Sequence, residues 1–293
     1  MVRPTIAGVS VLNTVRGAFS LLLFSLNTIF WSVPILLIQL LKLALPARAW
    51  RRFWGRLQDG IGTLWISINN LNLRVLNPVR WTVEMPDAPA MDQWYVVVAN
   101  HQSWVDILVL QRIFNGRIPF LKFFLKKELF WVPFLGLAWW SLDYPFLERS
   151  RNPARDLEAI RRAAEKFKVA PVSIMNFVEG TRFRPEKREG QNSPYAHLLK
   201  PRAGGLTSIL GFMGERVQGI LDVTIAYPHG VPTLWQFLCG ETKEIRVRVE
   251  KVAVTPDLRG DFGEDRQYRR HFTRWLRERW KEKDERMHEM LGG

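Results

Sequence analysis

A histidine and an aspartate five residues apart are the first pair in this chain whose types and spacing can do chemistry. Residues 100–106 read NHQSWVD and contain His101 and Asp106. Imidazole takes up a proton near neutral pH and serves as a general base. A carboxylate on one ring nitrogen would fix the tautomer, free the other nitrogen and stabilise the imidazolium. The structural alternative is a helix capping box formed by Ser103 and Asp106, and both roles can hold together.

A second polar cluster, FVEGTR, follows another short apolar run. It supplies Glu179, Gly180, Thr181 and Arg182. Gly180 permits a tight turn, and Arg182 can grip a phosphate through two parallel hydrogen bonds. The neighbouring sequence adds further positive charge, from Lys187, Arg188, Lys200 and Arg202. The alternative is an ion pair between Glu179 and Arg182 on a solvated turn.

Two weaker signals lie between these motifs. Lys126 and Lys127 open the segment KKELFWVPFLG, and Arg149 ends FLER. Each could contact a phosphate. Their alternatives are a basic turn and a surface ion pair, respectively.

The elements that must position these residues alternate between strands and helices. Short β-branched or apolar runs predict strands at 94–99, 119–125, 142–148, 171–178 and 218–227, and the alternation in 244–254 predicts a half-exposed edge strand. Helical patterns cover 104–114, a segment from Asn152-Pro153 onward, 204–213 and 265–290. This order predicts an α/β fold, a mixed sheet flanked by helices. Strand ends that lead into helices tend to line the reactive crevice, so both motifs are expected there.

The N-terminal part carries a long apolar run. Residues 17–41 contain no charged side chain, and about 20 apolar residues can span a bilayer as a helix. A cleaved secretory signal and the core helix of a soluble protein are the alternatives to a membrane anchor. Pro34 leaves two geometries open: one tilted span or two short helices dipping into one leaflet. Basic residues on both flanks favour dipping, and the Arg- and Trp-rich segment 47–57 is expected to lie on the surface.

Composition limits the remaining choices. The chain has 293 residues and a net charge of +14, which favours polyanionic surfaces such as anionic lipid, phosphorylated substrates or nucleic acid. The one cysteine, Cys239, excludes an intramolecular disulfide framework and a multi-cysteine metal site. The histidines show no metal-ligand spacing, so no metal is predicted.

Taken in order, the four motifs resemble those of the lysophosphatidic acid acyltransferase (1-acyl-sn-glycerol-3-phosphate acyltransferase) family. NHQSWVD is similar to its His-x4-Asp block, KKELFWVPFLG with FLER to its second block, and FVEGTR to its Glu-Gly-Thr-Arg block, with Val178 where proline is usual. The downstream segments LLKPRAGG and DVTIAYP also match. EGTRFRPEK and DVTIAYP resemble the YihG-type and lysocardiolipin-type branch.

This resemblance implies a glycerolipid acyltransferase-like fold and an activity. A fatty acyl chain would move from a thioester, on coenzyme A or acyl carrier protein, to the sn-2 hydroxyl of a lysophospholipid. His101 would be the general base, oriented by Asp106. Arg182 would hold the acceptor phosphate, Glu179, Gly180 and Thr181 would shape its loop, and further phosphate contacts would come from Arg149, Lys126 and Lys127. The thioester is a co-substrate, and no other cofactor is implied.

The expected organisation has three parts: a membrane anchor with an interfacial helix at 1–58, an acyltransferase domain at 59–260 and a charged, solvated helix at 261–293. The expected location is the bacterial inner membrane, with the site facing the cytoplasm and membrane lipids as partners. Two rival functions stay open. One is nucleic-acid binding through the C-terminal helix, where arginines alternate with Phe272, Trp275 and Trp280, although no nucleic acid is expected. The other is a non-catalytic membrane scaffold on an enzyme fold.

Overall fold

The computed structural model describes residues 11–85, 89–148, 153–260 and 263–292. Its α-helices are α1 Val11–Ala44, α2 Arg48–Leu76, α3 Val105–Phe114, α4 Leu135–Ser141, α5 Pro153–Phe167, α6 Pro185–Gly190, α7 Ala203–Met213, α8 Leu234–Leu238 and α9 Arg266–Leu291. The strands are β1 Arg80–Glu84, β2 Trp94–Ala99, β3 Leu121–Phe123, β4 Leu125–Lys126, β5 Phe146–Leu147, β6 Ser173–Asn176, β7 Val217–Ala226 and β8 Glu244–Val252. Short 3-10 helices are η1 Lys127–Trp131, η2 Gly214–Arg216 and η3 Pro256–Leu258.

The centre of the fold is a mixed sheet with strand order β1-β8-β7-β2-β6-β3. Strands β3, β6, β2 and β7 run parallel, while β8 runs antiparallel to β7. The carboxyl ends of the four parallel strands therefore meet at one edge, where both sequence motifs begin. The predicted α/β class with a mixed sheet flanked by helices is confirmed.

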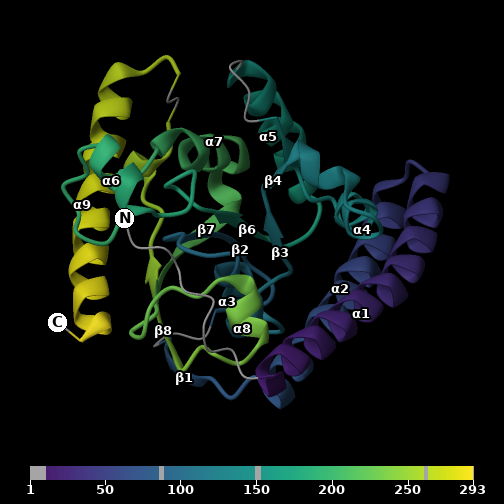
Figure 1. Cartoon of the computed structure of the whole chain (residues 1–293). Coiled ribbons are helices and arrows are strands. Elements are labelled where there is room, and N and C mark those ends of the chain that lie inside the picture. Colours follow the sequence, from purple (N-terminus) through teal and green to yellow (C-terminus); the bar gives the residue numbers. More distant parts are fainter. Residues whose placement is uncertain (1–10, 86–88, 149–152, 261–262, 293) are drawn as a thin grey trace.

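Helices cover both faces of this sheet, and each face has its own hydrophobic core. Alternate side chains along a strand point into one core or the other. Along β2, Tyr95, Val97 and Ala99 pack with the face that holds α3 and the N-terminal helices. Val96 and Val98 pack with α5, α7 and α9 on the other face. Figure 1 shows this three-layer arrangement, with α1 and α2 on one side and α9 on the other.

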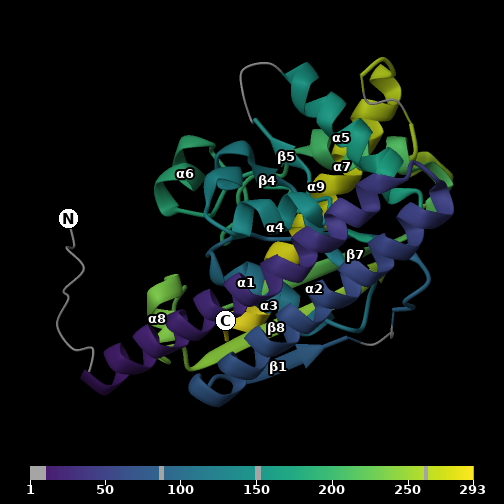
Figure 2. The same ribbon diagram turned by 90° about the vertical axis from the view of Figure 1, so that its right-hand side faces the viewer.

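The apolar run lies in one continuous helix, α1, which passes through Pro34 without ending. The alternative of two short helices within the run is therefore wrong. Instead α1 forms an antiparallel hairpin with α2, and both helices lie along the domain (Figure 2). The polar residues of α1 face this partner: Asn27 donates to Asn69 at 2.8 Å, and Ser20 donates to Asn72 at 3.2 Å.

The outer side of α1 is apolar and exposed. Its exposed side chains recur at helical spacing, namely Phe19, Leu22, Leu26, Phe30, Val33, Leu37 and Leu40. This helix is long and apolar enough to cross a membrane. The exposed apolar stripe argues against the alternative of a buried core helix. The surface segment expected at 47–57 is the first part of α2, which continues unbroken across the expected domain boundary at residue 58.

Several predicted strands need correction. Residues 119–125 and 142–148 contribute only β3, β4 and β5, and β4 pairs with β5 in a separate small sheet. Strand β8 is not an edge strand, because β1, which the sequence analysis missed, pairs with it and forms the edge. Asn152, the expected N-cap of α5, lies outside the described residues.

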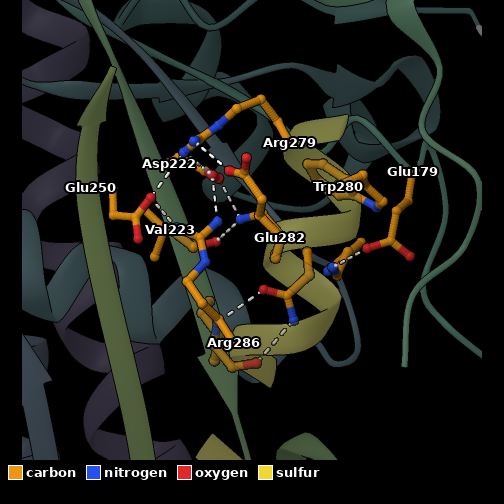
Figure 3. A network of polar contacts seen from close by, with 12 residues as sticks. Glu179, Asp222, Val223, Glu250, Arg279, Trp280, Glu282 and Arg286 are labelled. Carbon is orange, nitrogen blue, oxygen red and sulfur yellow. Dashed lines mark hydrogen bonds and ion pairs between the residues drawn. The ribbon is translucent and has the colours of Figure 1, made fainter. Parts of the chain in front are cut away.

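The C-terminal helix α9 is not simply a solvated charged helix. Lys283 is fully buried and lies 2.5 Å from Asp222 on β7. Arg286 pairs with Asp222 at 2.9 Å and also with Glu250 on β8 (Figure 3). This network of buried ion pairs fixes α9 to the sheet.

The aromatic side chains of α9 do not form a stacking platform. Phe272 and Trp280 are buried in the core, and the Trp280 indole donates to the Leu199 carbonyl at 3.1 Å. Nucleic-acid binding through exposed rings on this helix loses its structural basis, because base stacking needs accessible faces.

Candidate active site

The loop that carries His101 is held at the end of β2 by a side chain that continues the sheet. Asn100 is buried, donates to the Ile225 carbonyl at 2.9 Å and accepts from the Ile225 amide at 2.9 Å. The side chain thereby extends the pairing between β2 and β7 by one residue. Ser103 donates to the Pro232 carbonyl, which ties the same loop to the segment before α8.

The expected contact between His101 and Asp106 is present. Nδ1 of His101 lies 2.8 Å from Oδ2 of Asp106. The same oxygen accepts the backbone N–H groups of Gln102 at 2.6 Å and Ser103 at 2.8 Å. Asp106 therefore braces the loop before α3 and holds the histidine ring at once. The expected capping box is formed only in part, because the Ser103 hydroxyl accepts the N–H of Val105 and not that of Asp106. That His101 acts as a general base stays a prediction.

Tyr227 completes the surroundings of Asp106. Its hydroxyl donates to Oδ1 of Asp106 at 2.6 Å, and burial raises the pKa of this tyrosine. The carboxylate is fully buried and accepts four hydrogen bonds. These four bonds fix the position of the carboxylate beside Nδ1, an arrangement that would leave Nε2 of His101 available for proton transfer.

The ring of His101 is oriented from a second side by Phe177, at the end of β6. The two rings stack with centroids 3.9 Å apart and planes inclined by 16°. The histidine side chain retains 15% exposure. It is therefore held by packing and hydrogen bonding, yet reachable from outside.

Glu179 links the two sequence motifs through the backbone. Its carboxyl group accepts the N–H of His101 at 3.1 Å and the N–H of Leu199 at 3.0 Å. The side chain is fully buried, and burial raises its pKa to about 8. An ion pair with Arg182 on a solvated turn, the alternative interpretation, is wrong for Glu179.

The turn after Glu179 places Arg182 beside the histidine loop. Gly180 has φ +70°, in the left-handed region that favours glycine, and its N–H donates to the Phe177 carbonyl at 2.9 Å. The guanidinium of Arg182 lies 5.0 Å from the ring centroid of Trp104, a cation–π contact. Since the Phe183 amide also donates to the His101 carbonyl, the two motifs form one local unit.

A cluster of cations surrounds this unit. Lys187 donates to the hydroxyl of Thr181 and to the Arg182 carbonyl. Burial and the neighbouring charges of Arg184, Arg182 and Lys126 lower the pKa of Lys187. Lys126, distant in sequence, also contributes to this lowering of the pKa of Lys187. Several cations gathered in this way could bind an anion.

The remaining expected residues behave differently. The ammonium group of Lys127 is paired with Glu148 at 2.6 Å. Arg149 lies outside the described residues. The backbone N–H groups of Gln102 and Ser103 donate to Asp106 and are therefore engaged within the loop. Among the described residues, no cluster of histidine, cysteine or acidic side chains could hold a metal ion.

Four contributors were missed by the sequence analysis as parts of the site: Trp104, Phe177, Lys187 in its contact with Thr181, and Tyr227. Phe177 and Tyr227 could have been found, because each lies at the carboxyl end of a strand next to β2. The contacts of Trp104 and Lys187 depend on the path of loops, which the hydrophobic periodicity of the sequence does not predict.

Comparison with known proteins identifies the family. The Acyltransferase family model matches residues 80–227, about half of the chain. The chain belongs to the acyltransferase family. The matched region of this acyltransferase contains β2, the His101 loop, the Glu179 turn and Tyr227.

Its relatives act on lysophospholipids, according to their names. 1-Acyl-sn-glycerol-3-phosphate acyltransferase 3 of Arabidopsis thaliana is 30% identical over 173 residues, 53% of this chain and 45% of the relative. Lysocardiolipin acyltransferase 1 of Danio rerio is 26% identical over 294 residues, 93% of this chain and 70% of the relative. The chain therefore spans less than half the length of the plant relative.

A solved structure confirms the fold. The crystal structure of the 1-acyl-sn-glycerophosphate acyltransferase PlsC from Thermotoga maritima aligns with a TM-score of 0.55 and 20% identity. The alignment covers 94% of this chain and 97% of the bacterial chain. The acyltransferase thus shares the PlsC-like fold.

Proposed function

We propose that this acyltransferase moves a fatty acyl chain from an acyl thioester, on coenzyme A or acyl carrier protein, to the sn-2 hydroxyl of a lysophospholipid. The observation that carries the proposal is the contact between His101 and Asp106 beside a cluster of cations. The preferred acceptor is 1-acyl-sn-glycerol-3-phosphate, which gives phosphatidic acid. The relatives named for lysophosphatidic acid and lysocardiolipin support an acceptor with a phosphate group.

The reaction follows from the geometry of His101. Nε2 accepts the proton of the acceptor hydroxyl while that oxygen attacks the thioester carbonyl carbon. The carbon–sulfur bond then breaks, and the imidazolium returns the proton to the leaving thiolate. Asp106 holds Nδ1 and stabilises the imidazolium, because its negative charge lies 2.8 Å away. The acceptor itself is activated, so no acyl-enzyme is needed.

The cations give the acceptor its orientation. Arg182, whose guanidinium lies over the ring of Trp104, can offer two N–H groups to one phosphate. Lys126 and Lys187 lie close enough to share the negative charge. Lys127 contributes less directly, because Glu148 already neutralises it.

Membrane association follows from α1. This helix is about 50 Å long, which exceeds the hydrocarbon thickness of roughly 30 Å. It also packs on α2 along its length and on α4 and α8. A helix attached to the domain in this way lies in one leaflet, since crossing the bilayer would draw the folded domain into hydrocarbon. Attachment to the bacterial inner membrane, with the site toward the cytoplasm, stays a prediction.

The test is an assay of purified protein with lysophospholipids of several headgroups and with acyl-CoA or acyl carrier protein donors. The His101→Ala variant is expected to lower turnover by about 10²–10⁴, the range for loss of a general base. His271→Ala is the matched control, because His271 also pairs with an aspartate, Asp257, at 2.7 Å, but on the surface. If wild-type protein transfers no acyl group from any donor, a non-catalytic membrane scaffold becomes the better interpretation.

A further inference from the structure

We infer that residues 129–140, which include the second half of η1 and nearly all of α4, form a second membrane-inserting surface beside α1. Its occupant is the lipid of an anionic bilayer. The inference rests on membrane attachment through α1, as proposed above, and extends it to an element outside the N-terminal helices.

The segment is unusually apolar for an exposed surface. Residues 129–142 read LFWVPFLGLAWWSL and contain no charged side chain. Five of their large apolar side chains are exposed: Trp131, Val132, Phe134, Leu137 and Trp140. Trp131 is 80% exposed, the largest fraction among these five. Contiguous exposed apolar surface of this kind marks an interaction site.

The backbone holds these side chains outward in a tightly built loop. Phe134 has φ +61°, a conformation that is strained for a residue with a side chain. Gly136 is buried against η1, and a Cβ atom there would lie 1.9 Å from the Phe130 carbonyl oxygen. The exposure of Trp131 and Phe134 is therefore a fixed feature of the fold, and strain of this kind is retained at functional sites.

Continuity with α1 favours lipid as the occupant. Helix α4 packs against α1, and Lys42 of α1 pairs with Asp143 just after α4. In Figure 2, α4 lies alongside α1 on the same side of the molecule. The exposed apolar stripe of α1 and the surface of residues 129–140 thus adjoin each other, and a bilayer that covers one reaches the other.

Charge at the margin points to the same occupant. Lys126 and Lys127 precede the segment and are separated from it by Glu128. Lys127 pairs with Glu148, whereas Lys126 is exposed beside the cation cluster of the site. Cations next to apolar and indole side chains match an anionic headgroup layer above hydrocarbon, where tryptophan side chains concentrate. A lipid acceptor entering from this layer would meet the cations first.

The primary test places a reporter at the most exposed position. Trp131→Cys, labelled with an environment-sensitive fluorophore, is compared with Met91→Cys, which is 55% exposed before β2 and thus toward the opposite edge of the sheet. The native Cys239 is buried and is blocked or replaced if it reacts. Vesicles contain phosphatidylethanolamine and phosphatidylglycerol, with or without a spin label on the acyl chains.

We expect the fluorescence at position 131 to shift to the blue on vesicle binding and to be quenched by the acyl-chain spin label, while position 91 stays unchanged. An unshifted, unquenched label at 131 on vesicle-bound protein would overturn the inference, as would failure of the labelled full-length protein to bind vesicles. A blue shift without vesicles would indicate self-association through this surface and would also overturn it.

A second experiment separates insertion from catalysis. The double variant Trp131→Glu with Phe134→Glu is expected to retain turnover with lysophospholipid in detergent micelles and to lose at least tenfold with the same lipid in vesicles. Met91→Glu is the control for an added charge and should retain both activities. Equal turnover of the double variant on vesicles and micelles contradicts the inference. Absence of activity in the wild type contradicts the proposed reaction instead, and the fluorescence result then decides insertion alone.

Discussion

Asp106→Asn tests how much of the proposed reaction depends on the charge beside His101. Asparagine has the shape of aspartate but lacks its charge. Its amide oxygen can keep the two backbone N–H groups that lie 2.6 and 2.8 Å from Oδ2, and the amide nitrogen then replaces Oδ1. The hydroxyl of Tyr227, now 2.6 Å from a donor, can rotate to accept. The site should therefore keep its geometry.

The magnitude follows from the hydrogen bonds that survive. Two backbone donors hold the amide oxygen toward His101, so the amide is not expected to reverse and force the wrong tautomer. What is lost is the charge on the acceptor of the Nδ1–H bond. A hydrogen bond to a charged group contributes about 1.5–3 kcal/mol, and loss of about 2–3 kcal/mol in the transition state lowers kcat by roughly 30- to 150-fold.

The assay measures kcat and KM for both substrates in detergent micelles, where membrane attachment does not limit the rate. Asp257→Asn is the control, because Asp257 pairs with His271 at 2.7 Å on the surface. Thermal unfolding of each variant verifies that the fold is intact. A folded Asp106→Asn protein with kcat within twofold of wild type would refute the role assigned to this carboxylate, whatever the activity of the control.

Two further outcomes are expected. Glu179→Gln should be less stable than wild type, and the difference should shrink from pH 5 to pH 8. Burial raises the pKa of Glu179 to about 8, so between pH 5 and pH 8 the folded wild type holds a proton that the unfolded chain releases. The free energy of unfolding of the wild type therefore falls across this range, while that of the variant does not. A constant difference between the two proteins in denaturant titrations would contradict this. Arg182→Ala should raise KM for the acceptor about 10- to 100-fold with little change in kcat, because a bidentate phosphate contact is lost; Arg161→Ala, in an exposed pair with Glu158, is the control, and equal KM values would argue against acceptor binding by Arg182.

The sequence was most informative where a local pattern decides the structure. The strand before His101, the five-residue spacing to Asp106 and the turn at Gly180 each depend on a few adjacent residues, and the structure has them as expected. The alternation in residues 244–254 correctly predicted strand β8, but the strand was expected at the edge of the sheet and lies inside it. Arg246, Arg248 and Glu250 lie beside α9 and remain partly exposed.

Contacts between distant segments could not be derived in this way. Arg246, Arg248 and Glu250 on β8 each bond to α9, so a half-polar strand fits the interior of the sheet. No periodicity in the helix reveals that Lys283 meets Asp222 on β7. The same holds for Tyr227, whose contact with Asp106 requires β7 to lie next to β2.

The placement of Lys126 connects the proposed chemistry to the proposed membrane surface. This residue ends β4, acts electrostatically on the cations near Arg182 and forms the N-cap of η1. Five residues later, Trp131 projects from the end of η1. Because the loop between η1 and α4 is closely packed, the depth of Trp131 in the bilayer fixes the height of the cation cluster above it. An acceptor whose phosphate lies at the headgroup level can then reach Arg182 while its acyl chain stays in hydrocarbon. The enzyme would not have to withdraw the lipid from the membrane before His101 removes the hydroxyl proton.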